Sequence, residues 1–499
     1  MSRRREDTEI SVPPRLAVRP ESVMVRRFMA LELDRLERVH LLGIGGIGVS
    51  AVARLLLARG IRVSGSDVKE SSITRELRRE GAILHIGHDA SHLSKDLQAV
   101  IHSTAIPADN VELVAARTLG LPIHHRSDLL AALVADHADA VGVTGTHGKG
   151  TVCTMVTRIL DHAGRNPGWC IGAMPMDYGV NARSTDGSVF VAEVDESDGS
   201  QLRVRPVHVL VTFIEADHLN YYDSVDDIVA HATRFVTEND RLQTLVLNVG
   251  CAGVRDLAGR LDQPWVGYCA TGQDVGADWT LSEIDAGPRS VGLDVLRKGD
   301  RLGRLELPVP GEHNAENALA ATALAMEAFG VSFGQCAEAL AKFHGLENRF
   351  TIVDVPSLGV TLVKDYLSHP TGMRKVLRAA RRLVDADRGG RLVVVYKPYR
   401  FTLLKYLGGE YAEAFEAADH VVLTNLYSGG ETPIEGIDDD YLPNSCRERG
   451  LEVTHVDDTE DIAGFLDEWL RPGDAVALFG GDDFFRMADG WAESRQGPG

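Results

Sequence analysis

The sequence has no surplus of basic residues and no long apolar run, and both absences restrict the classes of function. Lys and Arg number 52 against 72 Asp and Glu, which gives a formal net charge of −20 over 499 residues. A surface this acidic repels a phosphate backbone, so we expect no nucleic-acid partner. No stretch reaches the roughly 18 apolar residues of a membrane span, and no apolar segment follows the basic residues 3–5. We therefore expect no signal peptide and no membrane partner.

Cysteine is also scarce, and its spacing excludes two further classes of protein. No C-x-x-C pair is present, so neither a zinc knuckle nor a disulfide framework fits the chain. Scattered, reduced thiols are typical of a cytoplasmic protein, and we expect a monomer or homodimer there. The cysteines are Cys153, Cys170, Cys251, Cys269, Cys336 and Cys446.

At about 150 residues per domain, the length predicts roughly three domains. Residues 1–35 are charged and proline-dotted, which suggests an extension with one short helix. From there, short apolar runs alternate with amphipathic stretches, the pattern of βαβ units and parallel sheets. We expect an α/β protein with domains at 36–137, 138–347 and 348–499. Strands are expected at 39–42, 62–65, 99–102, 140–143, 190–192, 207–211, 361–363, 392–395 and 475–478, and helices at 71–80, 110–119, 314–328 and 336–342.

A glycine-rich turn follows the first expected strand and opens a helix. It reads Gly43-Ile44-Gly45-Gly46-Ile47-Gly48, and Asp67 lies about 20 residues further on. Such glycines let backbone amides approach a diphosphate at a helix N-terminus. A dehydrogenase that binds a nicotinamide dinucleotide is one interpretation, and a tight turn that binds nothing is another.

A second glycine-rich loop argues against the dehydrogenase. Residues 145–151 read Gly-Thr-His-Gly-Lys-Gly-Thr and lie between the expected strand 140–143 and a helix that begins near Val152. Successive amides in such a loop form an anion-binding nest, and Lys149 would neutralise the β- and γ-phosphates of a triphosphate. A hydroxyl just after the lysine, here that of Thr151, commonly contacts Mg²⁺. A chance loop of this composition is the alternative.

Two acidic segments follow the next expected strands. Residues 193–198 read Glu-Val-Asp-Glu-Ser-Asp, and residues 215–218 read Glu-Ala-Asp-His. Carboxylates and an imidazole at the carboxyl edge of a parallel sheet, beside a phosphate loop, are suited to Mg²⁺-ATP. Solvated loop acids are the alternative for either segment alone.

In this order and spacing, the motifs resemble the muramyl (Mur) ligase superfamily, and within it the UDP-N-acetylmuramate–L-alanine ligases, from about residue 39 to 481. The resemblance implies a Rossmann-like first domain, a central P-loop-type ATPase domain with a parallel sheet, and a Rossmann-like third domain. It also implies an ADP-forming ligase that uses ATP and Mg²⁺ and joins a UDP-sugar-linked or similar carboxylate to an amino acid or other amine through an acyl phosphate. The first glycine loop would then hold the diphosphate of a UDP-sugar. The matching runs are 40–48, 64–67, 103–106, 145–149, 181–183, 195–198, 214–218 and 313–317.

The resemblance also implies a role for individual residues. Catalytic roles fall to Lys149, Glu196 and His218, and metal binding to Thr151, Glu196 and His218. ATP binding falls to Gly145, Thr146, His147, Gly148, Lys149, Gly150, Thr151, Asn314, Asn317, Arg349 and Asp365. Binding of the UDP substrate falls to Gly45, Gly46, Ile47, Gly48, Asp67, Ser103, Thr104 and Arg183, and of the amine to Ser368, His369, Tyr399, Arg400 and Leu403. Helix capping by the two asparagines, and a plain strand-end acid at Asp365, are the alternatives for those positions.

Three features qualify the resemblance. No lysine lies between Lys149 and Lys298, which excludes the carbamylated lysine of several related ligases and suits the alanine-adding branch. Where that branch has threonine after the loop lysine, this chain has Gly150, as in the folylpolyglutamate synthase branch. In the third domain, serine and tyrosine replace two histidines and Leu403 replaces an arginine of the family pattern. Loss of that guanidinium would remove a carboxylate clamp.

We therefore expect a Mur-type ligase with altered amine specificity in a specialised pathway. The alternatives are the ordinary L-alanine ligase of peptidoglycan synthesis and a catalytically silent nucleotide-binding paralogue.

Overall fold

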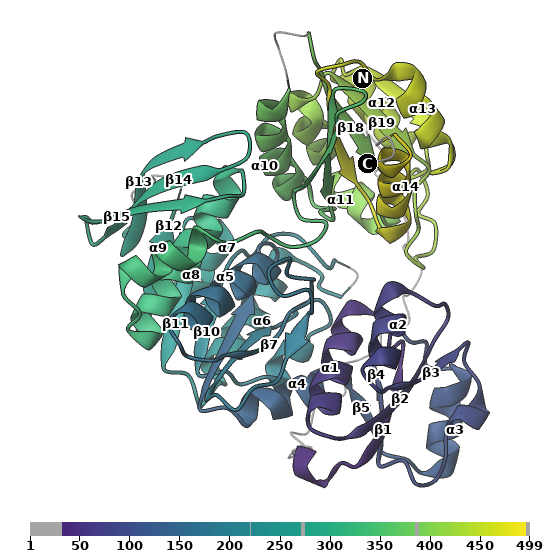
Figure 1. The fold of residues 1–499 in the computed structure, drawn as a ribbon, viewed down its shortest axis with the longest axis vertical. Coiled ribbons are helices and arrows are strands. Elements are labelled where there is room, and N and C mark those ends of the chain that lie inside the picture. The colour runs from purple at the N-terminus through teal and green to yellow at the C-terminus, as the bar shows by residue number, and fades with distance from the viewer. Residues whose placement is uncertain (1–31, 220, 271–274, 385–388, 496–499) are drawn as a thin grey trace, which may run out of the picture.

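The computed structural model describes residues 32–219, 221–270, 275–384 and 389–495 (Figure 1). Within these residues the strands form three sheets of five, ten and six strands, within residues 38–125, 139–307 and 351–479. The expected three-domain α/β architecture is confirmed, and each expected strand and helix coincides with an element of the structure. Of the expected extension, residues 1–31 lie outside the described residues, and Leu33–Arg35 forms the short helix η1. No described helix combines the length and apolar character needed to cross a bilayer.

The first sheet is parallel throughout, with the strand order β3-β2-β1-β4-β5. The order reverses between β1 and β4, so the loops after these two strands border a crevice at the carboxyl edge, where open α/β sheets bind ligands. The glycine-rich turn follows β1, and Ser103 follows β4. The elements are β1 (Arg38–Leu42), α1 (Ile47–Ala58), β2 (Arg62–Asp67), α2 (Ser72–Arg79), β3 (Ile83–Ile86), η2 (Ala90–His92), β4 (Ala99–His102), α3 (Val111–Leu119), β5 (Ile123–His125) and α4 (Arg126–Ala135).

The central sheet has the order β15-β14-β13-β12-β11-β10-β6-β9-β7-β8, with parallel pairs from β13 to β7 and antiparallel pairs at its two ends. Strands β6, β9 and β10 are adjacent and parallel, so the loops that follow them meet at one edge. The strands are β6 (Asp139–Thr144), β7 (Gly168–Cys170), β8 (Ala182–Arg183), β9 (Val189–Glu193), β10 (His208–Val211), β11 (Thr244–Asn248), β12 (Val266–Cys269), β13 (Trp279–Ala286), β14 (Val291–Arg297) and β15 (Asp300–Leu307).

The antiparallel meander β13–β15 extends the expected parallel sheet and was not predicted. Only β14 has a mainly buried pattern, whereas β13 and β15 are largely exposed and lack a continuous apolar run. Helices α5 and α8 pack against each other, and the long α8 is alanine-rich, which permits close approach. The central helices are α5 (Lys149–His162), η3 (Ser200–Arg203), α6 (Val225–Thr237), α7 (Ala252–Ala258), α8 (Glu312–Phe329) and α9 (Phe333–Leu340).

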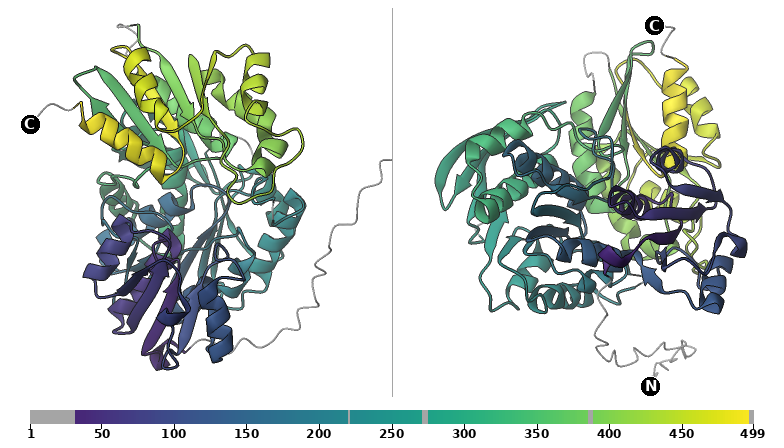
Figure 2. Two further views of the ribbon diagram at one scale, coloured as in Figure 1. Left: turned by 90° about the vertical axis from the view of Figure 1, so that its right-hand side faces the viewer. Right: turned by 60° about the horizontal axis from the view of Figure 1, so that its bottom comes forward.

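The third sheet, in the order β16-β17-β21-β18-β19-β20, is parallel except for β16. Figure 2 shows this domain, green to yellow, lying across from the other two. Its elements are β16 (Thr351–Val355), β17 (Val360–Asp365), α10 (Pro370–Ala380), η4 (Arg381–Leu383), β18 (Leu392–Tyr396), α11 (Phe401–Ala414), η6 (Phe415–Ala417), β19 (His420–Thr424), α12 (Tyr441–Glu448), β20 (Val453–Val456), α13 (Asp461–Trp469), β21 (Ala475–Phe479) and α14 (Asp482–Glu493).

Candidate active site

Two cavities meet at the loop after β6. The first, of about 460 Å³, lies between this loop, α8 and the start of the third domain. The second, of about 600 Å³, opens between the first glycine loop, the acidic segments and residues 366–369. Thr146, His147 and Lys149 line both cavities. A ligand in either cavity therefore reaches the same phosphate-type loop.

The backbone of this loop requires glycine at two positions. Gly145 has φ of 122°, and a Cβ there would lie 2.6 Å from the Phe213 carbonyl oxygen. Gly148 has φ of 80° and caps the N-terminus of α5. A Cβ at this position would lie 2.7 Å from Asn317 Oδ1, which is too close. The Thr146 amide donates to the Phe213 carbonyl at 2.8 Å, which fixes the loop to the strand β10 side. The amides that begin α5 remain available to an anion.

A methyl group at Gly148 should therefore impair the first cavity without removing any charge. We expect Gly148→Ala to weaken ATP binding about tenfold, because a left-handed backbone and the contact with Asn317 disfavour the added Cβ. Titration calorimetry with a non-hydrolysable ATP analogue measures this effect. Gly164→Ala is the matched control, since it also has positive φ but no atom within 4 Å of its Cβ position. Equal loss of affinity in both variants would contradict the expectation.

Lys149 lies among carboxylates, with its side chain 13% exposed. Its Nζ lies 2.9 and 3.0 Å from the two Glu196 carboxylate oxygens and 2.8 Å from the Gly145 carbonyl oxygen. Burial alone would lower the pKa of this ammonium group, but Glu196, Asp195 and Glu193 outweigh burial and raise the pKa. Lys149 is consequently a permanent cation at the junction of the two cavities.

Asp195, Glu196 and His218 form a cluster whose ligating atoms lie within 4.8 Å of one another. Burial raises the pKa of Asp195, but Lys149 and Arg126 hold it at about 2. His218 has φ of 53°, and its Nε2 lies 3.5 Å from Glu196 Oε1. Burial alone would lower the pKa of His218, but the neighbouring Glu196 and Asp217 outweigh burial, so the pKa is raised.

The donor set of this cluster fits a divalent cation. Two carboxylates supply the oxygen ligands that Mg²⁺ prefers, and the imidazole is compatible with Mn²⁺ as well. The Lys149 ammonium contacts Glu196, which shows that the negative charge of this cluster attracts positive charge. Asp195 was not among the expected metal ligands. Thr151 lines the first cavity, outside this cluster, and its metal role stays a prediction.

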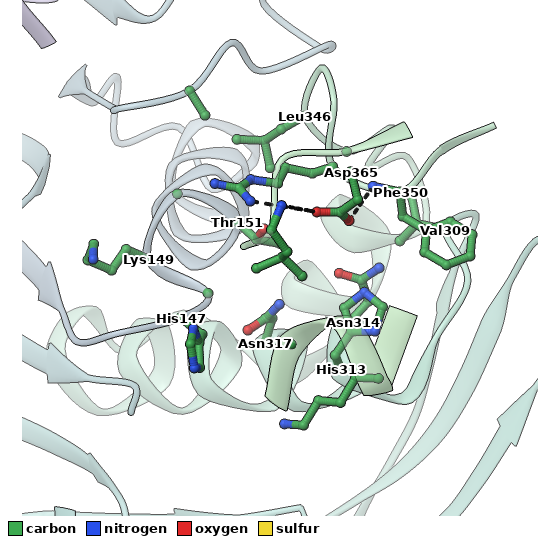
Figure 3. A pocket seen from close by; sticks show the side chains of 18 of the residues that line it. His147, Lys149, Thr151, Val309, His313, Asn314, Asn317, Leu346, Phe350 and Asp365 are labelled. Carbon is green, nitrogen blue, oxygen red and sulfur yellow. Dashed lines mark hydrogen bonds and ion pairs between the residues drawn. The ribbon is translucent and has the colours of Figure 1, made fainter. Parts of the chain in front are cut away.

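The first cavity collects most of the expected ATP-binding residues. Asn314 and Asn317 lie on the first turns of α8, and Asn314 Nδ2 donates to the Pro310 carbonyl at 2.7 Å (Figure 3). In Figure 3 the Lys149 side chain points away from these asparagines. Of the residues expected to bind ATP, Gly145 does not line this cavity. The others do: Thr146, His147, Gly148, Lys149, Gly150, Thr151, Asn314, Asn317, Arg349 and Asp365.

Asp365 organises the entry to the third domain. Its carboxylate accepts hydrogen bonds from the amides of Phe350 and Leu367, both at 2.9 Å, and Arg349 Nη1 lies 3.6 Å away. Burial raises the pKa of Asp365, and Arg349 partly offsets this. The carboxylate thus shapes the segment that carries Arg349, a guanidinium that lines both cavities.

The second cavity contains five of the residues expected to bind the UDP substrate: Gly46, Ile47, Gly48, Asp67 and Ser103. Gly45 lies just outside its lining, and its amide donates to Asp67 Oδ2 at 2.9 Å. The Thr104 hydroxyl donates a hydrogen bond to Asp198 Oδ2 at 3.2 Å. The Arg183 guanidinium lies over the Trp169 ring, 5.3 Å from its centroid, and lines neither cavity.

The residues expected to bind the amine separate into two groups. Ser368 and His369 line the second cavity. Burial and His147 lower the pKa of His369 to about 4, and its Nε2 lies 3.2 Å from the Ala216 carbonyl oxygen. This contact joins the third domain to the central one.

Tyr399, Arg400 and Leu403 line neither cavity. Tyr399 stacks on Tyr427, and Arg400 lies over the Tyr399 ring. Leu403 is 8% exposed and packs in the hydrophobic core of the third domain, because its position on α11 faces the sheet. Leu403, the residue that replaces the arginine of the family pattern, is therefore not part of either cavity.

Several cavity-lining side chains were missed by the sequence analysis. Lys375 on α10 pairs with Glu316 on α8 at 2.8 Å. His313, directly before Asn314 on α8, is half-buried and lines the first cavity. Arg126 at the start of α4 pairs with Asp195 at 2.7 Å. Lys375 and Arg126 each approach a partner on another domain, and of these two only Arg126, directly after a parallel strand, offered a signal. His313 lies in the run 313–317, next to the expected Asn314, and could have been found there.

Comparison with known families covers nearly the whole chain. Three family models match in order: "Mur ligase family, catalytic domain" over residues 38–138, "Mur ligase middle domain" over 143–325, and "Mur ligase, glutamate ligase domain" over 348–481.

Individual relatives agree with these models. A protein named UDP-N-acetylmuramate–L-alanine ligase from Pelotomaculum thermopropionicum is 37% identical over 454 residues, covering 91% of this chain and 96% of its own. One of the same name from Paenarthrobacter aurescens is 40% identical over 456 residues, covering 90% and 95%. The crystal structure of UDP-N-acetylmuramate-alanine ligase from Thermotoga maritima superposes with a TM-score of 0.77 at 27% identity, covering 92% of this chain and 99% of that one. The chain therefore belongs to the Mur ligase family and is an ATP-dependent, amide-forming ligase.

Proposed function

We propose that this enzyme is a UDP-N-acetylmuramate–L-alanine ligase that uses Mg²⁺-ATP. The observation that supports this proposal is the set of relatives of that name, which are 35–40% identical over about nine-tenths of the chain. The intact Lys149, Glu196 and His218 argue against a catalytically silent paralogue.

Altered amine specificity, our expectation from the sequence, gains no support. It depended on three replacements, and two of them, Tyr399 and Leu403, lie outside both cavities. The remaining one, Ser368, lines the second cavity beside His369. The ordinary L-alanine activity is therefore the function that we propose.

In the proposed arrangement, ATP occupies the first cavity with its base near Asn314 and Asn317, and its phosphates extend toward Lys149. The UDP-linked donor occupies the second cavity with its diphosphate at the start of α1, the helix N-terminus that favours anions. Both substrates then reach the cluster Asp195, Glu196 and His218. Mg²⁺ held by this cluster would supply Lewis-acid stabilisation of phosphoryl oxygens.

The proposed chemistry proceeds in two balanced steps. A donor carboxylate oxygen forms a bond to the γ-phosphorus as the bond to ADP breaks, which gives an acyl phosphate. The L-alanine nitrogen then attacks the acyl carbon, phosphate leaves with its oxygen, and the nitrogen loses a proton. Lys149 stabilises the negative charge that grows on the transferring group. The third domain, held through His369 and Lys375, limits access of water to the acyl phosphate.

The acceptor assay tests this proposal directly. The purified enzyme, incubated with UDP-N-acetylmuramate, Mg²⁺-ATP and one amino acid at a time, is expected to release ADP and phosphate fastest with L-alanine, by at least about tenfold over glycine or L-serine. Mass spectrometry should find the corresponding UDP-N-acetylmuramoyl-L-alanine. A different preferred amine would refute the acceptor assignment, and no substrate-dependent phosphate release with any amine would refute the ligase activity.

A further inference from the structure

Arg126 lines the second cavity between the start of α1 and Asp195, and no motif pointed to it. It is the first residue of α4, and its side chain, 20% exposed, lines the cavity. Helices α1 and α4 pack against each other beside the central domain (Figure 1). The guanidinium is thus placed where the first domain, the central domain and the cavity meet.

One guanidinium contacts both domains. Its Nη2 donates to Asp195 Oδ2 at 2.7 Å, and Asp195 belongs to the cation cluster of the central domain. On the other side, a Cβ placed on Gly48 would lie 3.3 Å from Nη1 and 3.6 Å from Cζ of the same arginine. The guanidinium therefore covers the first turn of α1, and Gly48 leaves it room to do so.

The hydrogen bonds of the first glycine loop show which amides remain for a ligand. Those of Gly43 and Ile44 donate to the Ser66 carbonyl at 2.8 and 3.1 Å. Gly45 donates to Asp67, and Gly46 donates to the Gly43 carbonyl at 3.0 Å. Four glycine-loop amides are consequently used to build the turn.

The amides left over are those of residues 47–49 at the start of α1, for which the described structure gives no acceptor. They lie in the turn that Arg126 covers. An anion bound by these amides would contact the guanidinium as well. Arginine has five N–H donors in a planar fork, so it can hold a phosphate oxygen and the Asp195 carboxylate together.

We infer that Arg126 binds the diphosphate of the donor together with the first amides of α1, and that its pair with Asp195 couples this diphosphate to the cation cluster. The inference rests on the proposed function, because it takes the donor to be a UDP-sugar. Arg126 is thereby a donor-binding residue contributed by α4, outside the glycine-rich fingerprint.

The chain offers a matched control for this residue. Arg203 in η3 pairs with Asp128 Oδ1 on α4 at 2.7 Å, across the same two domains, and lines neither cavity. Arg126→Gln and Arg203→Gln therefore each remove one ion pair between these domains. Only Arg126→Gln is expected to remove a ligand contact. Thermal melting should show both variants folded.

The probe is UDP itself, titrated calorimetrically into the full-length protein without ATP or Mg²⁺. Charge-assisted hydrogen bonds of this kind lead us to expect about 10- to 100-fold weaker UDP binding in Arg126→Gln. Arg126→Lys should recover part of the loss, and Arg203→Gln should bind UDP like the wild type. Asp195→Asn keeps the guanidinium, so its UDP affinity should be retained.

Two results would overturn the inference: wild-type UDP affinity in Arg126→Gln, and an equal loss of UDP affinity in Arg203→Gln. If the first is found together with weakened binding of UDP-N-acetylmuramate, the guanidinium contacts the donor carboxylate instead of the diphosphate. A wild-type protein that binds UDP in this Arg126-dependent way but does not ligate L-alanine would refute the proposed function and leave the inference standing.

Discussion

Replacing Lys149 with alanine is expected to lower kcat about 10³-fold or more while the protein stays folded. The loop backbone loses one contact, from Lys149 Nζ to the Gly145 carbonyl oxygen. The glycines at 145 and 148 and the Thr146–Phe213 hydrogen bond remain to define its conformation. What the variant loses is the permanent positive charge beside the transferring phosphoryl group. Charge neutralisation at phosphoryl transfer and loss of one preorganised donor have effects of this order.

Steady-state phosphate release, together with a thermal melt, measures this effect. Lys298→Ala is a suitable control, since that lysine is exposed on the β14–β15 turn and lines neither cavity. The Lys149 ammonium also balances Glu196, so the variant leaves this carboxylate without its closest cation. A folded Lys149→Ala enzyme with near-wild-type turnover would show that the loop does not drive catalysis.

The fold was predictable because each motif follows a strand whose apolar run is visible in the sequence. Glycine loops at 43–48 and 145–151 and the acids at 193–198 all end parallel strands, and parallel strands bring their carboxyl ends to one edge. Pairing of β6 with β9 and β10 then places Lys149 within 3 Å of Glu196, which agrees with the expectation that these acids lie beside the phosphate loop.

The limits of sequence reasoning appear where contacts cross domains. Arg126, Lys375 and His369 each meet a partner on another domain, and no periodicity within one element encodes such a distance. The reverse error occurred at Leu403, where a replacement within a family motif suggested an altered pocket. Its position on α11 buries it in the core, so its identity reflects packing in the third domain.

The second large effect is expected at the cation cluster. Glu196→Ala and His218→Ala should each lower activity about 10²-fold at the Mg²⁺ concentration that saturates the wild type, and excess Mg²⁺ should restore part of it. Removing one ligand weakens cation affinity, and mass action restores occupancy. Glu196 also contacts Lys149, so loss of that contact alone would lower kcat at every Mg²⁺ concentration. The Mg²⁺ concentration for half-maximal activity separates the two effects.

His218 gives the cleaner test. Its imidazole lies 3.5 Å from Glu196, and among the described residues Lys149 Nζ donates its hydrogen bonds to Gly145 and Glu196, not to His218. The matched control is His162→Ala, which removes a histidine paired with Glu338 at 3.0 Å on the same domain but outside both cavities. We expect the half-maximal Mg²⁺ concentration to rise at least about tenfold in His218→Ala and to stay unchanged in His162→Ala. An unshifted Mg²⁺ dependence in both His218→Ala and Glu196→Ala would mean that the catalytic cation binds elsewhere.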